Sequence, residues 1–154
     1  MALEKVKKYL KKFGLDEKIQ EFEVSSATVE LAAKALCTDE NRIAKTLSFL
    51  VENKPILIVC AGDTRIDNKK FKSEFSTKAN MIARENVEEM VGYKVGGVCP
   101  FGVNQNVLIY LDESLKRFET VFPACGTSNS AIELSIYELE KVVEFTKWID
   151  VCKY

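Results

Sequence analysis

The run from Pro55 to Ala61, Pro-Ile-Leu-Ile-Val-Cys-Ala, constrains the fold of this chain most, because it contains no charged or hydrogen-bonding side chain apart from one thiol. A strand with one buried face alternates apolar and polar residues. A continuous run of β-branched and aliphatic residues is instead typical of a strand that is covered on both faces. We therefore expect a sheet with structure packed against each of its two faces.

Short strands interleaved with helices are predicted around this run. Apolar spacing and capping residues predict helices over residues 3–13, ended by Gly14, and 29–36, capped by Thr28 or Ser26. Further helices are expected at 67–75, from a cap at Asn86 to Gly92, at 113–118 and from Ser135, and further strands at 45–51, 80–83, 106–111, 120–122 and 131–134. Because this order shows no strict βαβ alternation, we predict an α+β fold with a mixed sheet wrapped by helices.

The size and hydropathy of the chain indicate one domain. Its 154 residues are 47% hydrophobic, enough to bury a single core, so we expect a single domain spanning residues 1–154. There is no apolar run of about eighteen residues, and the lysine-studded N-terminus does not resemble a secretion signal. We expect a soluble, cytoplasmic protein without a membrane partner.

The charge balance argues against sequence-independent binding to nucleic acid, because the net charge is −1. A polyanion would have to meet a local patch of lysines. On the first predicted helix such a patch has two interpretations, a solvated face, which is the simpler, and a phosphate-contacting ridge. The lysines concerned are Lys5, Lys8 and Lys12 on that helix, and Lys69, Lys70 and Lys72 further along the chain.

Several kinds of chemistry are excluded by composition. The chain has no histidine, which removes Ser-His-Asp and Cys-His catalysis and histidine-based metal sites. Its five cysteines are widely spaced and form no Cys-x-x-Cys pair, so neither a disulfide framework nor a zinc site is expected. We predict no metal and no cofactor, and chemistry that depends on lysine, hydroxyls, backbone amides or the substrate itself.

Lys45 is the first candidate for such chemistry. The two-residue period of a strand places it on the same face as Leu47, Phe49 and Val51, which are expected to face the core. A lysine at the edge of an apolar face either reaches solvent or finds an anion. Both interpretations stay open, and the functional one is a fixed cation that binds a phosphate or polarises an ester carbonyl.

Two loops complete the candidate site. The segment 95–102, Val-Gly-Gly-Val-Cys-Pro-Phe-Gly, can form a rigid loop whose amides donate to a developing oxyanion, although a tight turn is the default explanation of such a segment. A second polar loop, 126–130, follows beyond the strand candidate 107–111, and loops at strand ends indicate one shared pocket. Cys99 could be a nucleophile, but no histidine is available to activate it. Glu133 could be a base, but a structural role for it is favoured.

Three motifs resemble, in order and spacing, those of the YbaK family of free-standing aminoacyl-tRNA deacylases, which are related to the editing domain of prolyl-tRNA synthetases. The motifs are Arg-Ile-Ala-Lys-Thr-Leu-Ser-Phe-Leu-Val at 42–51, the loop 95–102, and Gly-Thr-Ser-Asn-Ser-Ala-Ile-Glu-Leu at 126–134. The resemblance extends over roughly residues 20–145. It implies a mixed, barrel-like sheet surrounded by helices, with a pocket between the lysine strand and the glycine loop.

The resemblance also implies an activity, partners and residue roles. The expected reaction is hydrolysis of the ester of mischarged tRNA, most often cysteine or another small amino acid on the tRNA for proline. The expected partners are the acceptor end of that tRNA and a prolyl-tRNA synthetase. The implied catalytic residues are Lys45, Gly96, Gly97, Val98, Cys99 and Gly102, and the implied substrate-binding residues are Thr46, Pro100, Phe101, Gly126, Thr127, Ser128, Asn129 and Ser130.

The absence of histidine favours the cysteine-type members of the family, since a histidine contributes to the pocket of the synthetase-linked domains. The attacking group would be water or the thiol of a cysteinyl substrate. Two alternatives remain: a non-catalytic module that binds aminoacyl-tRNA or a nucleotide, or regulates a synthetase, and a Cys99-dependent hydrolase of a small ester or thioester.

Overall fold

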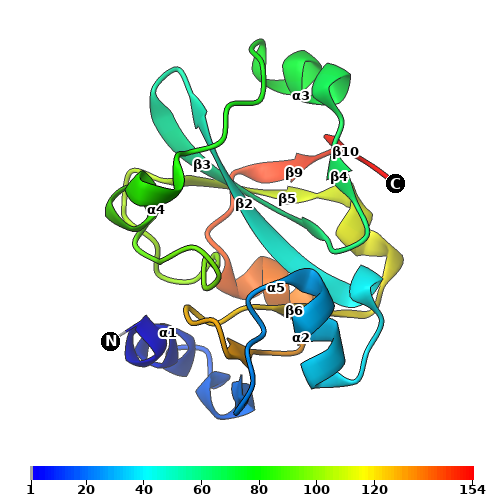
Figure 1. Cartoon of the computed structure of the whole chain (residues 1–154). Helices are drawn as coiled ribbons and strands as arrows, with labels where there is room; N and C mark the ends of the chain where they lie inside the picture. The colour runs from blue at the N-terminus through cyan, green and yellow to red at the C-terminus, as the bar shows by residue number, and fades with distance from the viewer. Residues whose placement is uncertain (1) are drawn as a thin grey trace.

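A curled six-stranded sheet forms the centre of the molecule in a computed structural model that describes residues 2–154 (Figure 1). The strand order is β8-β6-β2-β3-β5-β9. The pairs β8-β6 and β2-β3 are antiparallel, and the pairs β6-β2, β3-β5 and β5-β9 are parallel. Two small two-stranded sheets, β1-β7 and β10-β4, lie beside it. The strands are β1 (Gln20–Glu21), β2 (Ile43–Val51), β3 (Lys54–Ala61), β4 (Arg65–Ile66), β5 (Leu108–Asp112), β6 (Thr120–Pro123), β7 (Ser130–Ala131), β8 (Leu134–Ser135), β9 (Lys147–Ile149) and β10 (Cys152–Lys153).

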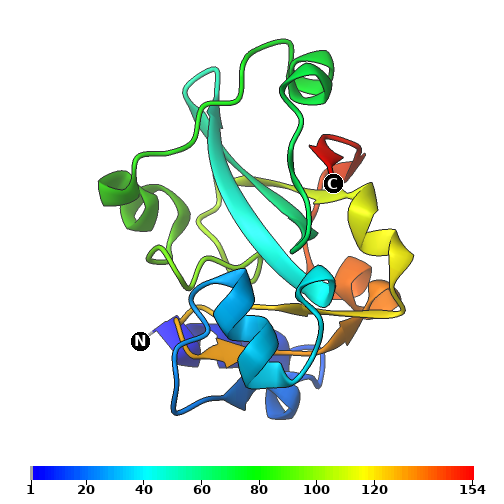
Figure 2. The same cartoon turned by 45° about the vertical axis from the view of Figure 1, so that its right-hand side comes forward.

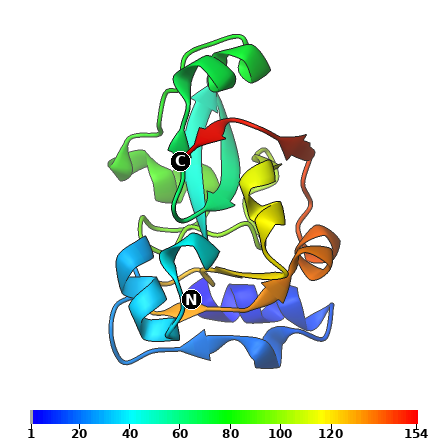
Figure 3. The same cartoon turned by 90° about the vertical axis from the view of Figure 1, so that its right-hand side faces the viewer.

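Helices surround this sheet, which confirms the predicted mixed α+β architecture. Figure 2 shows α2 in front of the lower end of β2 and α4 to its left, and Figure 3 shows α3 at the top and α1 at the bottom of the molecule. The helices are α1 (Ala2–Lys11), α2 (Val29–Leu36), α3 (Asn68–Phe75), α4 (Arg84–Val91) and α5 (Ile136–Val142), with short 3-10 turns η1 (Asp16–Lys18), η2 (Glu40–Arg42) and η3 (Glu113–Arg117).

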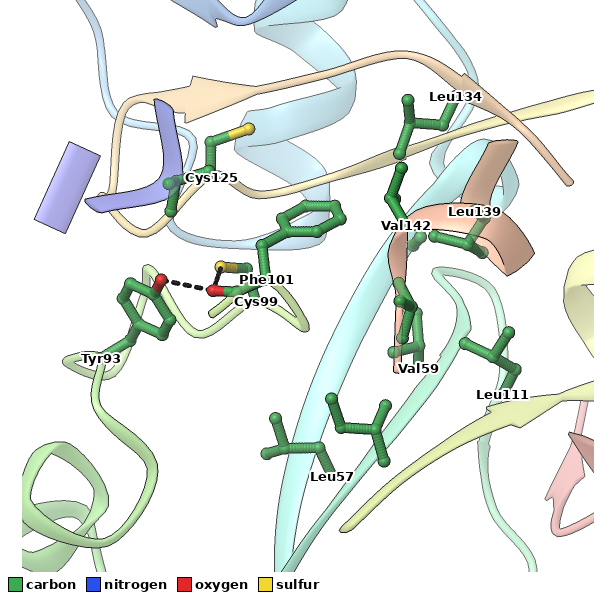
Figure 4. Close-up of a cluster of buried hydrophobic side chains, with 14 of the residues drawn as sticks. Leu57, Val59, Tyr93, Cys99, Phe101, Leu111, Cys125, Leu134, Leu139 and Val142 are labelled. Atoms are coloured by element: carbon green, nitrogen blue, oxygen red, sulfur yellow. Dashed lines mark hydrogen bonds between the residues drawn. The ribbon is translucent and has the colours of Figure 1, made fainter. Parts of the chain in front are cut away.

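Strand β3 is buried on both faces, as its apolar run predicts. Leu57 and Val59 point into the larger apolar cluster, to which α1, α4 and α5 also contribute residues (Figure 4). Ile56 and Ile58 point the other way, into a second cluster that includes Phe71 of α3. The two-residue period of the strand thus divides one apolar run between two cores.

Local capping sets most helix boundaries. Of the two expected caps of α2, Thr28 is the one used, since its hydroxyl accepts from the Leu31 amide at 3.1 Å. At α5 the predicted capping box of Ser135 and Glu138 is present.

Two sequence predictions are wrong in detail. Helix α4 begins at Arg84, two residues before the cap expected at Asn86, because the amide of Ile82 bonds to Ser48 of β2 and the chain turns away immediately afterwards. The strand expected at 131–134 is divided, since Ser130 and Ala131 pair with β1 whereas Leu134 and Ser135 form β8 beside β6. Pairing partners far away in sequence decide both boundaries.

Candidate functional site

An interruption in the pairing of β2 creates the main cavity. On its outer edge β2 pairs with β6 only at Ile43 and Ala44. Pairing resumes at Phe49, which bridges Met81, and the amide of Ile82 donates to Ser48. Between these points the strand edge carries Lys45 to Leu47 and is open, and a cavity of about 330 Å³ lies there.

The lining of this cavity comes from β2, the start of α2, the segment 81–87 and both predicted loops. It is mainly apolar. Five of the predicted site residues contribute to it: Lys45, Thr46, Gly96, Val98 and Ser130. The structure therefore brings together the three motifs that are separated in the sequence.

The ammonium group of Lys45 is held by backbone carbonyls. It donates to the Thr64 carbonyl and lies 3.5 Å from the Gly62 carbonyl, in the turn that follows β3. Lys45 sits opposite Cys60 at the end of the strand face that carries Leu47 and Phe49 toward the second apolar cluster. The ammonium is therefore not released to solvent, and no anion among the described residues pairs with it. The carbonyl dipoles fix a positive charge beside the cavity.

Thr46 lines the same cavity and carries an unsatisfied polar atom. Its Oγ1 is buried and has no hydrogen-bond partner among the residues that the structure describes. Buried polar atoms are nearly always bonded, so this hydroxyl is an exception among the residues that surround the cavity.

Gly97 serves to pack the two loops together. It is buried, and its amide donates to the Lys94 carbonyl at 3.0 Å, so this amide is already occupied. A Cβ at Gly97 would lie 2.5 Å from the Gly126 carbonyl oxygen and 2.8 Å from the Thr127 amide nitrogen. Only a residue without a side chain permits this approach.

The loop residues Cys99, Pro100 and Phe101 are buried behind the cavity and are not part of its lining. Figure 4 shows Cys99 and Phe101 inside the larger apolar cluster, where the Tyr93 hydroxyl donates to the Phe101 carbonyl. Burial raises the pKa of the Cys99 thiol to about 12, so the thiolate is scarce at neutral pH. Gly102 also faces away from the cavity, toward Tyr9 and Tyr93.

The second loop is held by the segment that precedes α2. The amide of Ser26 donates to the Ser128 carbonyl at 2.6 Å, and Asn129 Nδ2 donates to the Phe22 carbonyl at 3.0 Å. Within the loop, the hydroxyls of Thr127 and Ser130 lie 2.6 Å apart. Of residues 126–130, only Ser130 lines the cavity. Four residues of the predicted substrate-binding set lie outside the lining: Gly126, Thr127, Ser128 and Asn129.

Glu133 has the structural role that the sequence favours. Its carboxylate lies 3.1 Å from Arg42 Nη2 and accepts from the Thr120 hydroxyl at 2.6 Å. These contacts join β6 to the turn before β2.

The segment 81–87 was not expected at the site. Met81, Ile82, Arg84 and Val87 all line the cavity. For Arg84 the sequence contains a signal, because this cationic residue directly follows the strand candidate at 80–83. The strand expected at 80–83 is not formed, because only Met81 makes a bridge to β2, at Phe49. This contact with a distant strand could not be predicted from the sequence.

Other kinds of site are not seen in residues 2–154. No group of three or more His, Cys, Asp or Glu side chains there could hold a metal ion. In the same part of the chain, none of the helices has both the length and the apolar character needed to cross a membrane.

Comparison with known proteins identifies the family. Residues 23–142 match the model of the aminoacyl-tRNA editing domain. This chain belongs to that family. The match confirms the resemblance carried by the three motifs, and with it the enzyme class, a hydrolase that deacylates aminoacyl-tRNA.

Individual relatives agree with this assignment. The chain is 50% identical to the uncharacterized protein YwhH of Bacillus subtilis over 99% of its own length and 98% of that protein. It is 31% identical to EbsC of Enterococcus faecalis, a candidate Cys-tRNA(Pro)/Cys-tRNA(Cys) deacylase, over 70% of this chain and 67% of EbsC. It also matches 16% of the proline–tRNA ligase of Aquifex aeolicus, with 31% identity over 57% of this chain.

A solved structure supports the fold. A candidate trans-editing enzyme for prolyl-tRNA synthetase superposes with a TM-score of 0.88 at 27% identity, covering 99% of this chain and 98% of that one. The predicted editing-domain fold is confirmed.

Proposed function

We propose that this deacylase removes cysteine, or an amino acid of similar size, from the 3′-terminal ribose of the tRNA for proline. The observation that carries the proposal is the open edge of β2, where Lys45, Thr46 and the glycine loop face one cavity of about 330 Å³. A space of this size and mainly apolar lining suits a small side chain and part of a ribose. The similarity to EbsC supports cysteine as the amino acid.

Backbone amides of the glycine loop are proposed to stabilise the tetrahedral oxyanion. Gly96 and Val98 line the cavity, and their amides have no acceptor among residues 2–154. Gly97 is excluded as a donor because its amide is bonded to Lys94. Fixed donors of this kind act without reorganising as charge develops.

Lys45 is proposed to supply a fixed positive field. The carbonyls of Gly62 and Thr64 hold its ammonium in place. No conformational entropy of this side chain therefore has to be lost when the substrate binds. No described carboxylate lines the cavity to neutralise it.

The attacking group is proposed to be water or the substrate's own thiol. The chain has no histidine to act as a base, and a cysteinyl thiol would reduce the need for one. Because tRNA is charged in the cytoplasm, the reaction is proposed to occur there, with prolyl-tRNA synthetase as a partner that supplies mischarged tRNA.

A panel of mischarged tRNAs tests the proposal. Deacylation of the tRNA for proline carrying cysteine, alanine, serine or proline is measured with wild type and Lys45→Ala. We expect cysteine to be removed fastest and the variant to lose about 100-fold in kcat/KM, the scale of one lost electrostatic contact. Sparing of serine, which is similar in size, would indicate thiol participation.

Lys54→Ala is the matched control, because Lys54 is an exposed lysine of β3 outside the cavity lining. Binding without cleavage of any ester would instead support the non-catalytic module. Unchanged rates in Lys45→Ala would remove this lysine from the mechanism. Repeating the assay with added prolyl-tRNA synthetase measures whether that partner contributes.

A further inference from the structure

Two cationic side chains line the cavity, and only one of them is available to a ligand. The ammonium of Lys45 is engaged by the Thr64 carbonyl. Arg84 is exposed, and no ion pair or side-chain hydrogen bond joins its guanidinium to any of residues 2–154. No acidic side chain in the described lining competes for it.

The backbone holds Arg84 in a defined place. The residues just before it are joined to β2 through the Phe49–Met81 bridge and the Ile82 amide, which donates to Ser48 at 3.2 Å. Arg84 then begins α4, which is anchored by the buried side chains of Val87 and Val91. The guanidinium therefore extends from a fixed point on the wall of the cavity.

The proposed substrate carries a matching anion. When the ester of the terminal ribose enters the cavity, the nearest charged group of the same nucleotide is its 5′-phosphate. Burial of a phosphate in the mainly apolar interior would be costly, so it stays at the opening. Arginine is suited to phosphate because its planar guanidinium can form two parallel charge-assisted hydrogen bonds.

We propose that Arg84 binds the 5′-phosphate of the terminal nucleotide and thereby positions the ester against the glycine loop. This inference depends on the proposed function, since it assumes that a tRNA 3′ end occupies the cavity. It assigns phosphate binding to Arg84 and leaves Lys45 to act on the ester.

Two uncleavable ligands test this assignment, the cysteinyl amides of 3′-amino-3′-deoxyadenosine with and without a 5′-phosphate. We expect wild type to bind the phosphate-bearing ligand about tenfold more tightly, as one charge-assisted contact provides. In Arg84→Gln this ratio should fall to about one, and in Arg84→Lys it should be intermediate. Kinetically, Arg84→Gln should raise KM for aminoacyl-tRNA more than it lowers kcat.

Arg65→Gln is the matched control, because Arg65 is an exposed arginine of β4 outside the cavity lining, and it should keep the wild-type ratio. A preserved ratio in Arg84→Gln, or equal weakening of both ligands, would overturn the assignment. Failure of the proposed function would be distinct, because neither ligand would then bind to wild type.

Discussion

At the scale of single residues, Cys99 illustrates how burial decides reactivity. The side chain is fully buried in the larger apolar cluster, and burial raises the pKa of its thiol from 9.0 to about 12. A thiol with such a pKa cannot supply enough thiolate for nucleophilic attack near neutral pH. The structure therefore argues against the Cys99-dependent hydrolase.

We predict that Cys99→Ala keeps its rate of ester cleavage within a fewfold of wild type. The free energy of unfolding should fall by about 1 kcal/mol, because a buried sulfur is replaced by a small void. Deacylation of Cys-tRNA and chemical denaturation measure the two effects. A loss of activity in folded Cys99→Ala and Cys99→Ser protein would restore the thiol to the mechanism.

The same variant has a pH signature. The pKa of Cys99 is higher in the folded chain than in the unfolded chain. The contribution of the neutral thiol to the free energy of unfolding is therefore fully present below about pH 9 and is lost as the pH rises from 9.0 to about 12. Cys99→Ala should therefore show a shallower alkaline loss of stability than wild type.

Single-residue roles could be predicted from the sequence only in part. The motifs correctly place Lys45 and Ser130 at one cavity, because each lies in a short segment whose neighbours have a clear local pattern. The carbonyl contacts of Lys45, the occupied amide of Gly97 and the burial of Cys99 depend on residues that are distant in the chain or in space. The spacing of apolar and polar residues in the sequence does not predict such contacts.

At the scale of elements, the two loops behave as one packed unit. Gly97 lies directly against the peptide that joins Gly126 to Thr127, and the second loop is bonded to the segment before α2. Gly96 and Val98 flank Gly97 and form part of the cavity wall. The shape of that wall therefore depends on the contact between Gly97 and Gly126.

We predict that Gly97→Ala separates the loops and lowers kcat/KM by at least tenfold. The added methyl would meet backbone atoms at 2.5–2.8 Å, and overpacking of this kind costs about 1–3 kcal/mol of stability. Deacylation kinetics and thermal unfolding measure both effects.

Gly14→Ala provides the comparison, because Gly14 has a positive φ of 72° but open space around it. That variant should lose about 1 kcal/mol of stability and no activity. Full activity of Gly97→Ala would show that the loop contact is unimportant.

Elements with a strong local period were predicted well, and those made by distant pairing were not. Strands β2 and β3 and helices α1, α2, α3 and α5 follow from apolar spacing and caps, whereas α4 begins two residues before its expected cap. Strands β1, β4 and β10 have two residues each, and they exist only because partners more than eighty residues away align with them.

At the scale of the whole molecule, the lysines that the sequence suggests for contact with tRNA lie in two separate places. Helix α1, with Lys5 and Lys8 and followed directly by Lys12, lies at the bottom of the molecule, and α3, with Lys69 and Lys72, lies at the top (Figure 3). They cannot form one continuous patch. Helix α1 is the one that packs behind the glycine loop, through Tyr9 against Phe101 and Val6 close to Gly126.

We predict that α1 contributes to tRNA binding and that α3 does not. The double variant Lys8→Glu/Lys12→Glu should raise KM for aminoacyl-tRNA about tenfold. It should also reduce the salt slope of log kcat/KM by about one for each phosphate contact that is lost. Kinetics between about 50 and 200 mM salt measure this effect.

Lys69→Glu/Lys72→Glu makes the same change in net charge on α3 and should behave like wild type. Equal effects of the two double variants would mean that only the overall charge matters. The general charge balance in the sequence could not separate these groups, because their positions depend on the fold.

The open edge of β2 has a consequence for how such a protein can change its substrate. The cavity exists because β6 stops at the level of Ala44 and the Met81 segment begins only at Phe49. Extending either neighbour would shrink the chamber and shortening it would enlarge the chamber, at some cost in packing, because Val121 of β6 and Ile82 belong to the larger apolar cluster. The size of the accepted amino acid can therefore change through the lengths of two flanking segments, within limits set by the core residues that they carry.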